Sequence, residues 1–312
     1  LSLLGMAEYR NEAILWANHI PSFLQISDQS LALVLVPTFR EGAYRVTGPF
    51  SVSLSFAEFM ALIMPFVIYF ILFGRSWTLR GAAILLDMMM FVGILLTQAR
   101  VGLIGAVVAH ALMILVFAMK WWRTDRKSLI APAVLLSYPL GFVLMVSAIL
   151  LVDRLRISML GGGTTSASTE ARSIQIRGGI PLILERPLNG YGPGLGGRRL
   201  GFTTPGGQYT IDSGYLAMGL DYGLSGLLVI IFLIGTAAYL AWKVGMKAKR
   251  NSELELALCC FAVMGVWSVS RLVLAQEDNA LIVYPVMGMI MGLAYRQHQA
   301  EKLPQEPTGI DL

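Results

Sequence analysis

Residues 101–119 read VGLIGAVVAHALMILVFAM, a run without a single charged side chain. A helix needs about 20 mainly apolar residues to cross the hydrocarbon core of a bilayer, so this run predicts a membrane-spanning helix. Similar runs recur along the chain. The predicted spans cover residues 54–73, 81–97, 101–119, 129–152, 213–241, 256–275 and 279–295. The sequence therefore predicts an all-α, polytopic integral membrane protein with about seven transmembrane helices.

The composition of the whole chain points to the same class. Of 312 residues, 24 are basic and 19 acidic, so 14% are charged and 56% are hydrophobic, whereas a soluble domain carries about 25% charged residues. This excludes a soluble enzyme and a disordered chain. The two cysteines, Cys259 and Cys260, are adjacent inside an apolar run, which indicates packing residues and excludes a disulfide scaffold. The pI of 9.3 does not indicate nucleic acid, because the basic residues lie in short clusters between spans.

The basic clusters predict the orientation in the membrane. Lysine and arginine in short loops stay on the cytoplasmic side, and all six lysines fall in alternate connections and in the tail. The predicted organisation is an extracytoplasmic amphipathic segment 1–53, four spans in 54–152, a large extracytoplasmic loop 153–211, three spans in 212–295 and a cytoplasmic tail 296–312. No signal peptide is recognisable at Leu1, so a translocated start leads us to expect further spanning helices before it.

The large loop from Asp153 to Ile211 is rich in arginine. Its basic residues are Arg154, Arg156, Arg172, Arg177, Arg186, Arg198 and Arg199, against three acidic residues. Arginine pairs bidentately with phosphate, which indicates a phosphorylated ligand; pairing with lipid headgroups or local acids is the alternative. Helix-start residues at 166–170 predict a short helix on the membrane surface. Arg172 and Arg177 are about 140° apart around such a helix, so they cannot both point at one atom.

Further polar residues mark the beginning of the fifth span and the stretch before it. Asp212 lies where loop becomes helix, so a capping role is one interpretation. Asp221 would lie about 13 Å deeper in a continuous helix, and a carboxylate at such depth is expected to be held by partners. The glycines within 192–197 match the spacing of a dinucleotide fingerprint, but no strand precedes them, so we interpret them as a sharp turn beside a cleft. His110 is expected to form a hydrogen bond between helices.

The order of these motifs resembles the O-antigen ligase and polymerase superfamily of bacterial envelope proteins. The resemblance covers about residues 45–295. It depends on RVTGPF from Arg45, LTQARVGL from Leu96, Arg172, RPLNGYGPG from Arg186, DSGYL from Asp212 and DYGLSGLL from Asp221. Each motif is weak alone, whereas their order around one large outer loop is fairly specific.

The resemblance implies an enzyme of the bacterial inner membrane that acts on a glycan carried by polyprenyl pyrophosphate. Arginines would bind the pyrophosphate and stabilise its leaving charge in place of a metal, and Asp212 would accept the proton of the acceptor hydroxyl. The candidates are Asp212, Arg172 and Arg100 for catalysis and Arg177, Arg45, Arg186 and Tyr215 for substrate binding. We expect no metal and no cofactor. The expected partners are the bilayer and a chain-length regulator or flippase of the same pathway, without nucleic acid.

Two departures from the family pattern bear on the reaction. Ligases typically have histidine where this chain has Asp212, so the sequence favours an O-antigen or exopolysaccharide polymerase and keeps a ligase as the alternative. In place of the family's usual serine or threonine before Arg100, this chain has Ala99.

A transporter or flippase for an anionic lipid is the rival function from another class, and a non-catalytic scaffold is a third possibility. A flippase should carry cations along the membrane interior, whereas here Arg271 is near the outer end of its helix and the other cations lie at helix ends and in loops.

Overall fold

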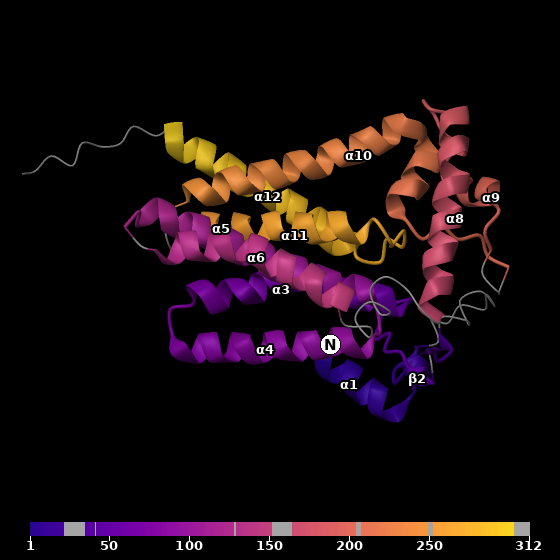
Figure 1. Cartoon of the computed structure of the whole chain (residues 1–312), viewed down its shortest axis with the longest axis horizontal. Helices are drawn as coiled ribbons and strands as arrows, with labels where there is room; N and C mark the ends of the chain where they lie inside the picture. Colours follow the sequence, from indigo (N-terminus) through magenta and orange to yellow (C-terminus); the bar gives the residue numbers. More distant parts are fainter. Residues whose placement is uncertain are drawn as a thin grey trace, which may run out of the picture.

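The computed structural model describes residues 1–21, 35–40, 42–127, 129–151, 164–203, 207–248 and 252–302. Long helices run along a common direction in one bundle, and α8 (Thr164–Glu185) crosses one end of it (Figure 1). The long helices of the bundle are α3 (Ser53–Phe73), α4 (Trp77–Leu96), α5 (Arg100–Thr124), α6 (Ile130–Leu151), α10 (Gly214–Lys247), α11 (Leu256–Ser270) and α12 (Ala280–Lys302). Two of the predicted arginines, Arg154 and Arg156, and Asp153 lie outside the described residues.

Five segments of the described chain are long and apolar enough to cross a membrane: α3, α4, α5, α10 and residues 253–270, which hold η4 (Glu253–Glu255) and α11. The all-α, multi-pass membrane class is therefore confirmed. Helices α6 and α12 occupy the two other predicted ranges but are not among these five, so the count of seven stays a prediction. Large apolar side chains on α4 and α10, such as Leu85 and Phe232, are exposed, as expected for helices that face lipid.

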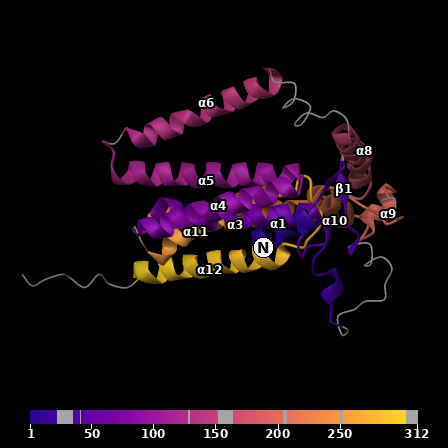
Figure 2. The same cartoon turned by 90° about the horizontal axis from the view of Figure 1, so that it is seen from below.

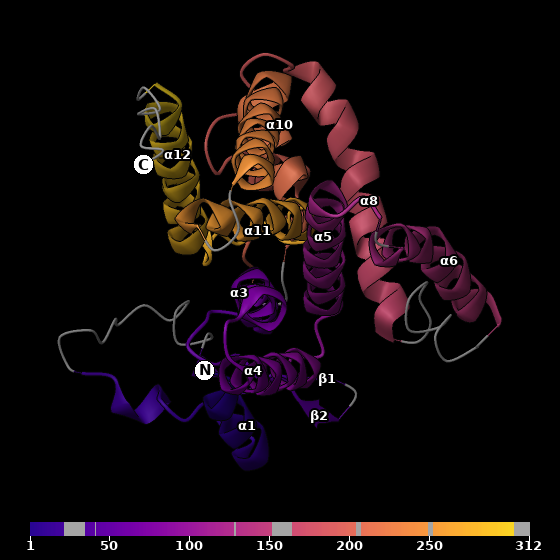
Figure 3. The ribbon, with the colours of Figure 1, turned by 90° about the vertical axis from the view of Figure 1, so that its left-hand side faces the viewer.

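Helix α11 lies at the centre of the bundle. It packs against α10, α5, α3 and α12, and Figure 3 shows α10, α5, α3 and α12 around it. Cys259 and Cys260 are free and fully buried on it, which confirms their packing role. Helices α3 and α5 approach closely because α5 has glycine at the contact: a Cβ on Gly102 would lie 2.5 Å from the Cβ of Ala57. Small residues allow this approach in membrane bundles.

Several polar side chains inside the bundle form contacts between helices. His110 on α5 lies 3.1 Å from Asp87 on α4 and 2.9 Å from the Ala106 carbonyl, so the expected interhelical hydrogen bond is confirmed. At the opposite end from α8, Lys120 contacts the buried Glu255 at 2.5 Å. The connections that carry lysines gather at this end, while α8 and the short elements that precede α3 and follow α8 gather at the other (Figures 1 and 2). This separation agrees with the alternation predicted from charge, and the sidedness itself stays a prediction.

The extramembrane segments at the α8 end are more regular than expected. Helix α1 (Ser2–Asn11), η1 (Ala17–His19) and the antiparallel pair β1 (Phe39–Arg40) and β2 (Ala43–Tyr44) precede α3. The prediction of only short helices in the large loop is wrong, because α8 extends over 22 residues while α9 (Gly196–Leu200) has five. Helix α8 continues because it packs directly on α10, with Gly179 at the contact, which gives it tertiary support that a surface helix lacks.

Candidate active site

Arg172 and Asp212 form an ion pair between α8 and the beginning of α10. The Nε atom of Arg172 lies 3.4 Å from Oδ2 of Asp212, and the two side chains are 31% and 32% exposed. The contact is not aligned as a hydrogen bond, since Arg172 Nε has no hydrogen-bond partner among the described residues. Both side chains are therefore partly exposed, although the Nε atom at the contact is itself buried.

Gln175 fixes the position of Asp212. It lies one turn after Arg172 on α8, is 2% exposed, and accepts the backbone N–H of Asp212 at 2.9 Å through Oε1. The side chain of Asp212 takes no part in capping α10. Ser213 is the N-cap, with Oγ accepting the N–H of Leu216 at 3.4 Å. The capping interpretation of Asp212 is therefore wrong, because the helix begins one residue too late for it and Ser213 fills that role.

Glycines allow α8 to lie against α10. A Cβ on Gly179 of α8 would come within 2.7 Å of a methyl carbon of Leu216, and one on Gly219 of α10 would come within 2.6 Å of a methyl carbon of Ile183. The two helices therefore have a glycine each at their contact. This close packing places Arg172 and Gln175 beside Asp212, directly after the large loop.

Asp221 holds the glycine-rich turn. Its Oδ2 accepts the N–H of Gly194 at 2.9 Å and its Oδ1 accepts that of Gly196 at 2.8 Å, which confirms that this carboxylate is structurally held. Helix α10 is not continuous beyond it, because Gly223 has φ 72° and ψ −168°. The N–H of Leu224, released by this break, donates to the Pro187 carbonyl at 2.6 Å. The turn and the kinked helix thus stabilise each other.

Arg45 lies beside the junction from which Arg100 begins α5. Its Nε donates to the Thr97 carbonyl at 3.0 Å, and Thr97 in turn accepts the N–H of Ala99 at 3.1 Å. Gln98 adopts φ 52° within this tight turn. Burial, and secondarily the charge of Arg40, lowers the pKa of Arg45. The structure thus brings Arg45 to the turn that precedes Arg100, and Arg100, the first residue of α5, is itself half-buried.

Glu8 orders the segment that carries Arg45. This fully buried carboxylate on α1 accepts the Tyr44 hydroxyl at 2.8 Å, the Thr47 N–H at 2.9 Å and the Gly48 N–H at 3.0 Å. Burial and the hydrogen bond to Glu8 raise the pKa of Tyr44. The RVTGPF motif is therefore folded around an acid 37 residues upstream of Arg45.

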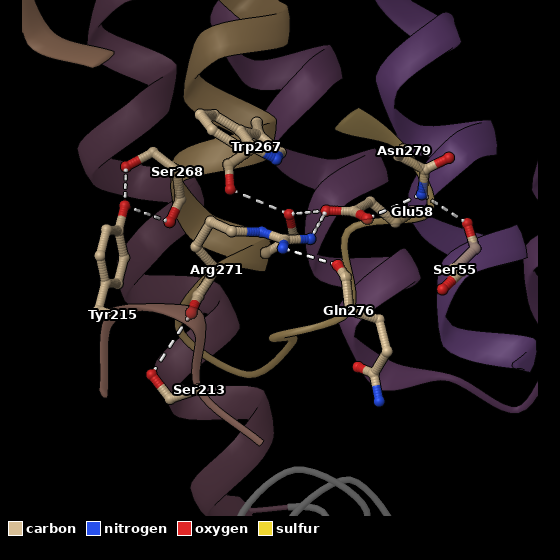
Figure 4. Close-up of polar contacts among 10 residues, drawn as sticks. Ser55, Glu58, Ser213, Tyr215, Trp267, Ser268, Arg271, Gln276 and Asn279 are labelled. Carbon is tan, nitrogen blue, oxygen red and sulfur yellow. Dashed lines mark hydrogen bonds and ion pairs between the residues drawn. The ribbon is translucent and has the colours of Figure 1, made fainter. Parts of the chain in front are cut away.

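The remaining predicted binding residues are dispersed. Arg177 is exposed on α8. Arg186 stacks on the ring of Tyr191 with 5.2 Å between guanidinium carbon and ring centroid, and Tyr191 donates to Glu185 at 2.7 Å. That hydrogen bond lowers the pKa of Glu185. Tyr215 points toward α11, where its hydroxyl contacts the hydroxyl of Ser268 at 2.9 Å (Figure 4).

Residues 85–231 match the model of the O-antigen ligase family. This match supports the resemblance to the superfamily of O-antigen ligases and polymerases that the sequence motifs indicated. A search of curated proteins finds no match to the chain. The O-antigen ligase match spans Arg100, Arg172, Asp212 and Asp221, so both the ion pair and the glycine-rich turn lie within it. Arg45 lies outside the matched residues.

A buried polar network that was not predicted from the sequence lies next to the beginning of α10. Arg271, at the end of α11, donates to Glu58 of α3 at 2.7 Å, and Asn279 donates to the other carboxylate oxygen at 2.8 Å (Figure 4). Ser270 also donates to Glu58. The backbone carbonyl of Arg271 accepts the N–H of Gly214 at 2.8 Å. The network therefore ties α3, α11 and α12 to the residue that begins α10, two positions after Asp212.

One sequence signal could have indicated this network. Glu58 is the one charged residue of the first predicted span and Arg271 the one of the sixth, and each lies near an end of its span. Charges inside membrane spans pair with one another. In the described residues, no group of three His, Cys, Asp or Glu side chains is placed to hold a metal ion.

Proposed function

We propose that this chain polymerises oligosaccharide repeats carried on polyprenyl pyrophosphate, by metal-independent glycosyl transfer on the extracytoplasmic face of the bacterial inner membrane. The Arg172–Asp212 pair carries this proposal. It combines a cation suited to pyrophosphate and a carboxylate suited to proton transfer at 3.4 Å, partly exposed, at one end of a membrane bundle.

In the proposed reaction, the pyrophosphate of the donor takes the place of Asp212 on the Arg172 guanidinium. This frees the carboxylate to accept the proton of the acceptor hydroxyl as its oxygen attacks the anomeric carbon of the donor. The bond between that carbon and the pyrophosphate oxygen breaks, and the electron pair leaves with the pyrophosphate. Arg172 and Arg100 stabilise this charge, as positioned donors do in other sites. Arg45, Arg177, Arg186 and Tyr215 are the proposed contacts to the rest of the substrates.

A ligase is the second candidate, because the match to the O-antigen ligase family supports either reaction. A ligase would use the same donor but would transfer the glycan to a lipid A-core acceptor. Asp212 in place of the ligase histidine supports the polymerase. The family match gives no support to a transporter or flippase. A chain-length regulator or a flippase of the same pathway remains a proposed partner of the enzyme.

The product distribution tests the proposal. Purified protein in nanodiscs is given lipid-linked repeats, and the glycans are separated by gel electrophoresis. A polymerase yields a ladder that extends with time, whereas a single addition to lipid A-core alone identifies a ligase and overturns the proposal. The same ladder is expected in EDTA, because arginines take the place of a metal. Loss of the ladder in EDTA and its rescue by Mg²⁺ would contradict the metal-independent mechanism.

A further inference from the structure

The first turns of α10 contact α8 on one side and border a cavity on the other. Leu216 and Gly219 face α8, whereas Met218 and Asp221 line a cavity of about 200 Å³ between α10, the end of α11 and the beginning of α12. Positions three to four residues apart share one face of a helix, and these two sets fall on opposite faces. The Arg172–Asp212 pair and the cavity are therefore separated by the thickness of this helix.

Aromatic side chains form much of the cavity wall. Trp267 is 5% exposed and forms the inner part, whereas Tyr222 and Tyr284 are 42% and 50% exposed and form the rim. Flat aromatic faces beside charged and hydrogen-bonding groups suit a ligand with both an apolar face and hydroxyl groups. A sugar ring has this chemistry.

Three polar side chains of the cavity wall are already held by contacts to other residues. Tyr215 is hydrogen-bonded to Ser268 at 2.9 Å, Asp221 accepts two backbone N–H groups, and Arg271 is bound to Glu58 at 2.7 Å. No rearrangement of these side chains is needed to shape the wall. Pre-formed walls of this kind are usual in small-molecule sites.

An apolar trough continues from the cavity along α10. It has a volume of about 510 Å³ and shares Met218, Tyr222 and Ile230 with the cavity. Its other lining includes Leu188 and Val229, and Val229 is 67% exposed. Such apolar surface on a membrane helix is suited to hydrocarbon. The cavity alone is smaller than the usual ligand pocket of about 300–1,000 Å³, whereas cavity and trough together fall within that range.

We propose that the cavity and the trough together bind a glycolipid, with a sugar ring against Trp267, Tyr222 and Tyr284 and the hydrocarbon chain along the trough. Under the proposed function, on which this role rests, this glycolipid is the acceptor repeat. Gly214 lines the cavity two residues after Asp212, so a glycan leaving the cavity passes the beginning of α10. Helix α10 would then separate the pyrophosphate of the donor from the lipid of the acceptor.

Photolabelling tests this site without turnover. The probe is dodecyl β-glucoside with a diazirine at the end of its chain, compared with the matching C12 alcohol, on the full chain in nanodiscs. We expect labelling of residues 218–230 that is about 5-fold stronger with the glucoside than with the alcohol, the gain expected from aromatic contacts to the ring. Equal labelling by the two probes would show an apolar groove only and would overturn the proposal, as would labelling elsewhere.

Two matched pairs of variants sharpen the result. Tyr284→Ala should remove the advantage of the glucoside, whereas Tyr295→Ala, on the same helix, exposed and outside the cavity lining, should keep it. Val229→Trp should lower labelling about 5-fold by filling the trough, whereas Leu228→Trp, 65% exposed and outside it, should not. Labelling unchanged by both Tyr284→Ala and Val229→Trp would overturn the site.

The acceptor role has a separate readout. In the polymerisation assay, Tyr284→Ala should raise the KM for the acceptor about 5-fold and leave the KM for the donor unchanged. Sugar-dependent labelling without any polymer would support the glycolipid site and overturn the proposed polymerase. A full ladder with no sugar-dependent labelling would support the proposed polymerase and overturn the glycolipid site.

Discussion

At the scale of single residues, Asp212 is the sharpest test of the proposed chemistry. Ser213 caps α10, so Asp212→Asn and Asp212→Ser leave the helix start intact and remove only the carboxylate. We expect both variants to insert normally and to lose about 100-fold or more of the turnover, the lower range for loss of a general base. Ser213→Ala is the control: it should cost about 1 kcal/mol of stability and keep most of the turnover. A ladder of normal rate from Asp212→Asn would remove Asp212 from the mechanism.

Arg172 tests the phosphate-binding role at the same scale. Arg172→Lys keeps the charge but loses the planar fork, so we expect at least about 10-fold lower kcat/KM for the lipid-linked donor. Arg198→Lys is the matched control, since Arg198 is an exposed arginine in the same loop, and it should be close to wild type. Similar activity of the two lysine variants, at equal expression, would mean that Arg172 serves only as a point charge.

At the scale of elements, the kink of α10 is what allows the helix to hold the glycine-rich turn. Gly223 adopts φ 72° and ψ −168°, a conformation open almost only to glycine, and a Cβ there would lie 2.5 Å from the Pro187 carbonyl oxygen. Gly223→Ala should therefore lower stability by about 1–3 kcal/mol, measured by thermal unfolding in detergent. Gly235→Ala on the same helix, where a Cβ meets no neighbour, should be neutral or stabilising by up to about 1 kcal/mol. Equal midpoints of thermal unfolding for the two variants would show that the kink does not require glycine at position 223.

At the scale of the whole molecule, the separation of charge between the two ends predicts the topology. A cysteine at the exposed position of Ser76 should react with a membrane-impermeant maleimide only from the cytoplasmic side, and one at Leu195, 46% exposed near the glycine-rich turn, only from outside. The native Cys259 and Cys260 are fully buried, so they should give little background. Labelling of position 195 from the cytoplasm would contradict the predicted topology and exclude an extracytoplasmic site.

The sequence by itself determined the membrane class, the approximate ranges of the long helices and the residues from which a site could be built. These are local properties, since a window of about 20 residues already decides whether a helix can enter lipid. Candidates such as Arg172 and Asp212 were also visible, because their charge stands out beside apolar spans. The sequence did not determine which candidates meet. Arg177 lies on the same helix as Arg172 and yet is exposed, because helix phase and packing decide which side chain faces α10.

Only the tertiary structure decided the contacts across the bundle. Glu58 and Arg271 are separated by 213 residues and meet because α3 and α11 pack together. The local sequence around either residue therefore does not predict their contact. The break at Gly223 was equally hidden, since a single glycine in an apolar helix is common and this one becomes necessary only when the Pro187 carbonyl lies beside it. The cavity beside Tyr215 likewise exists only where three helices converge. Each of these features depends on the distance between segments far apart in the chain, and packing sets that distance.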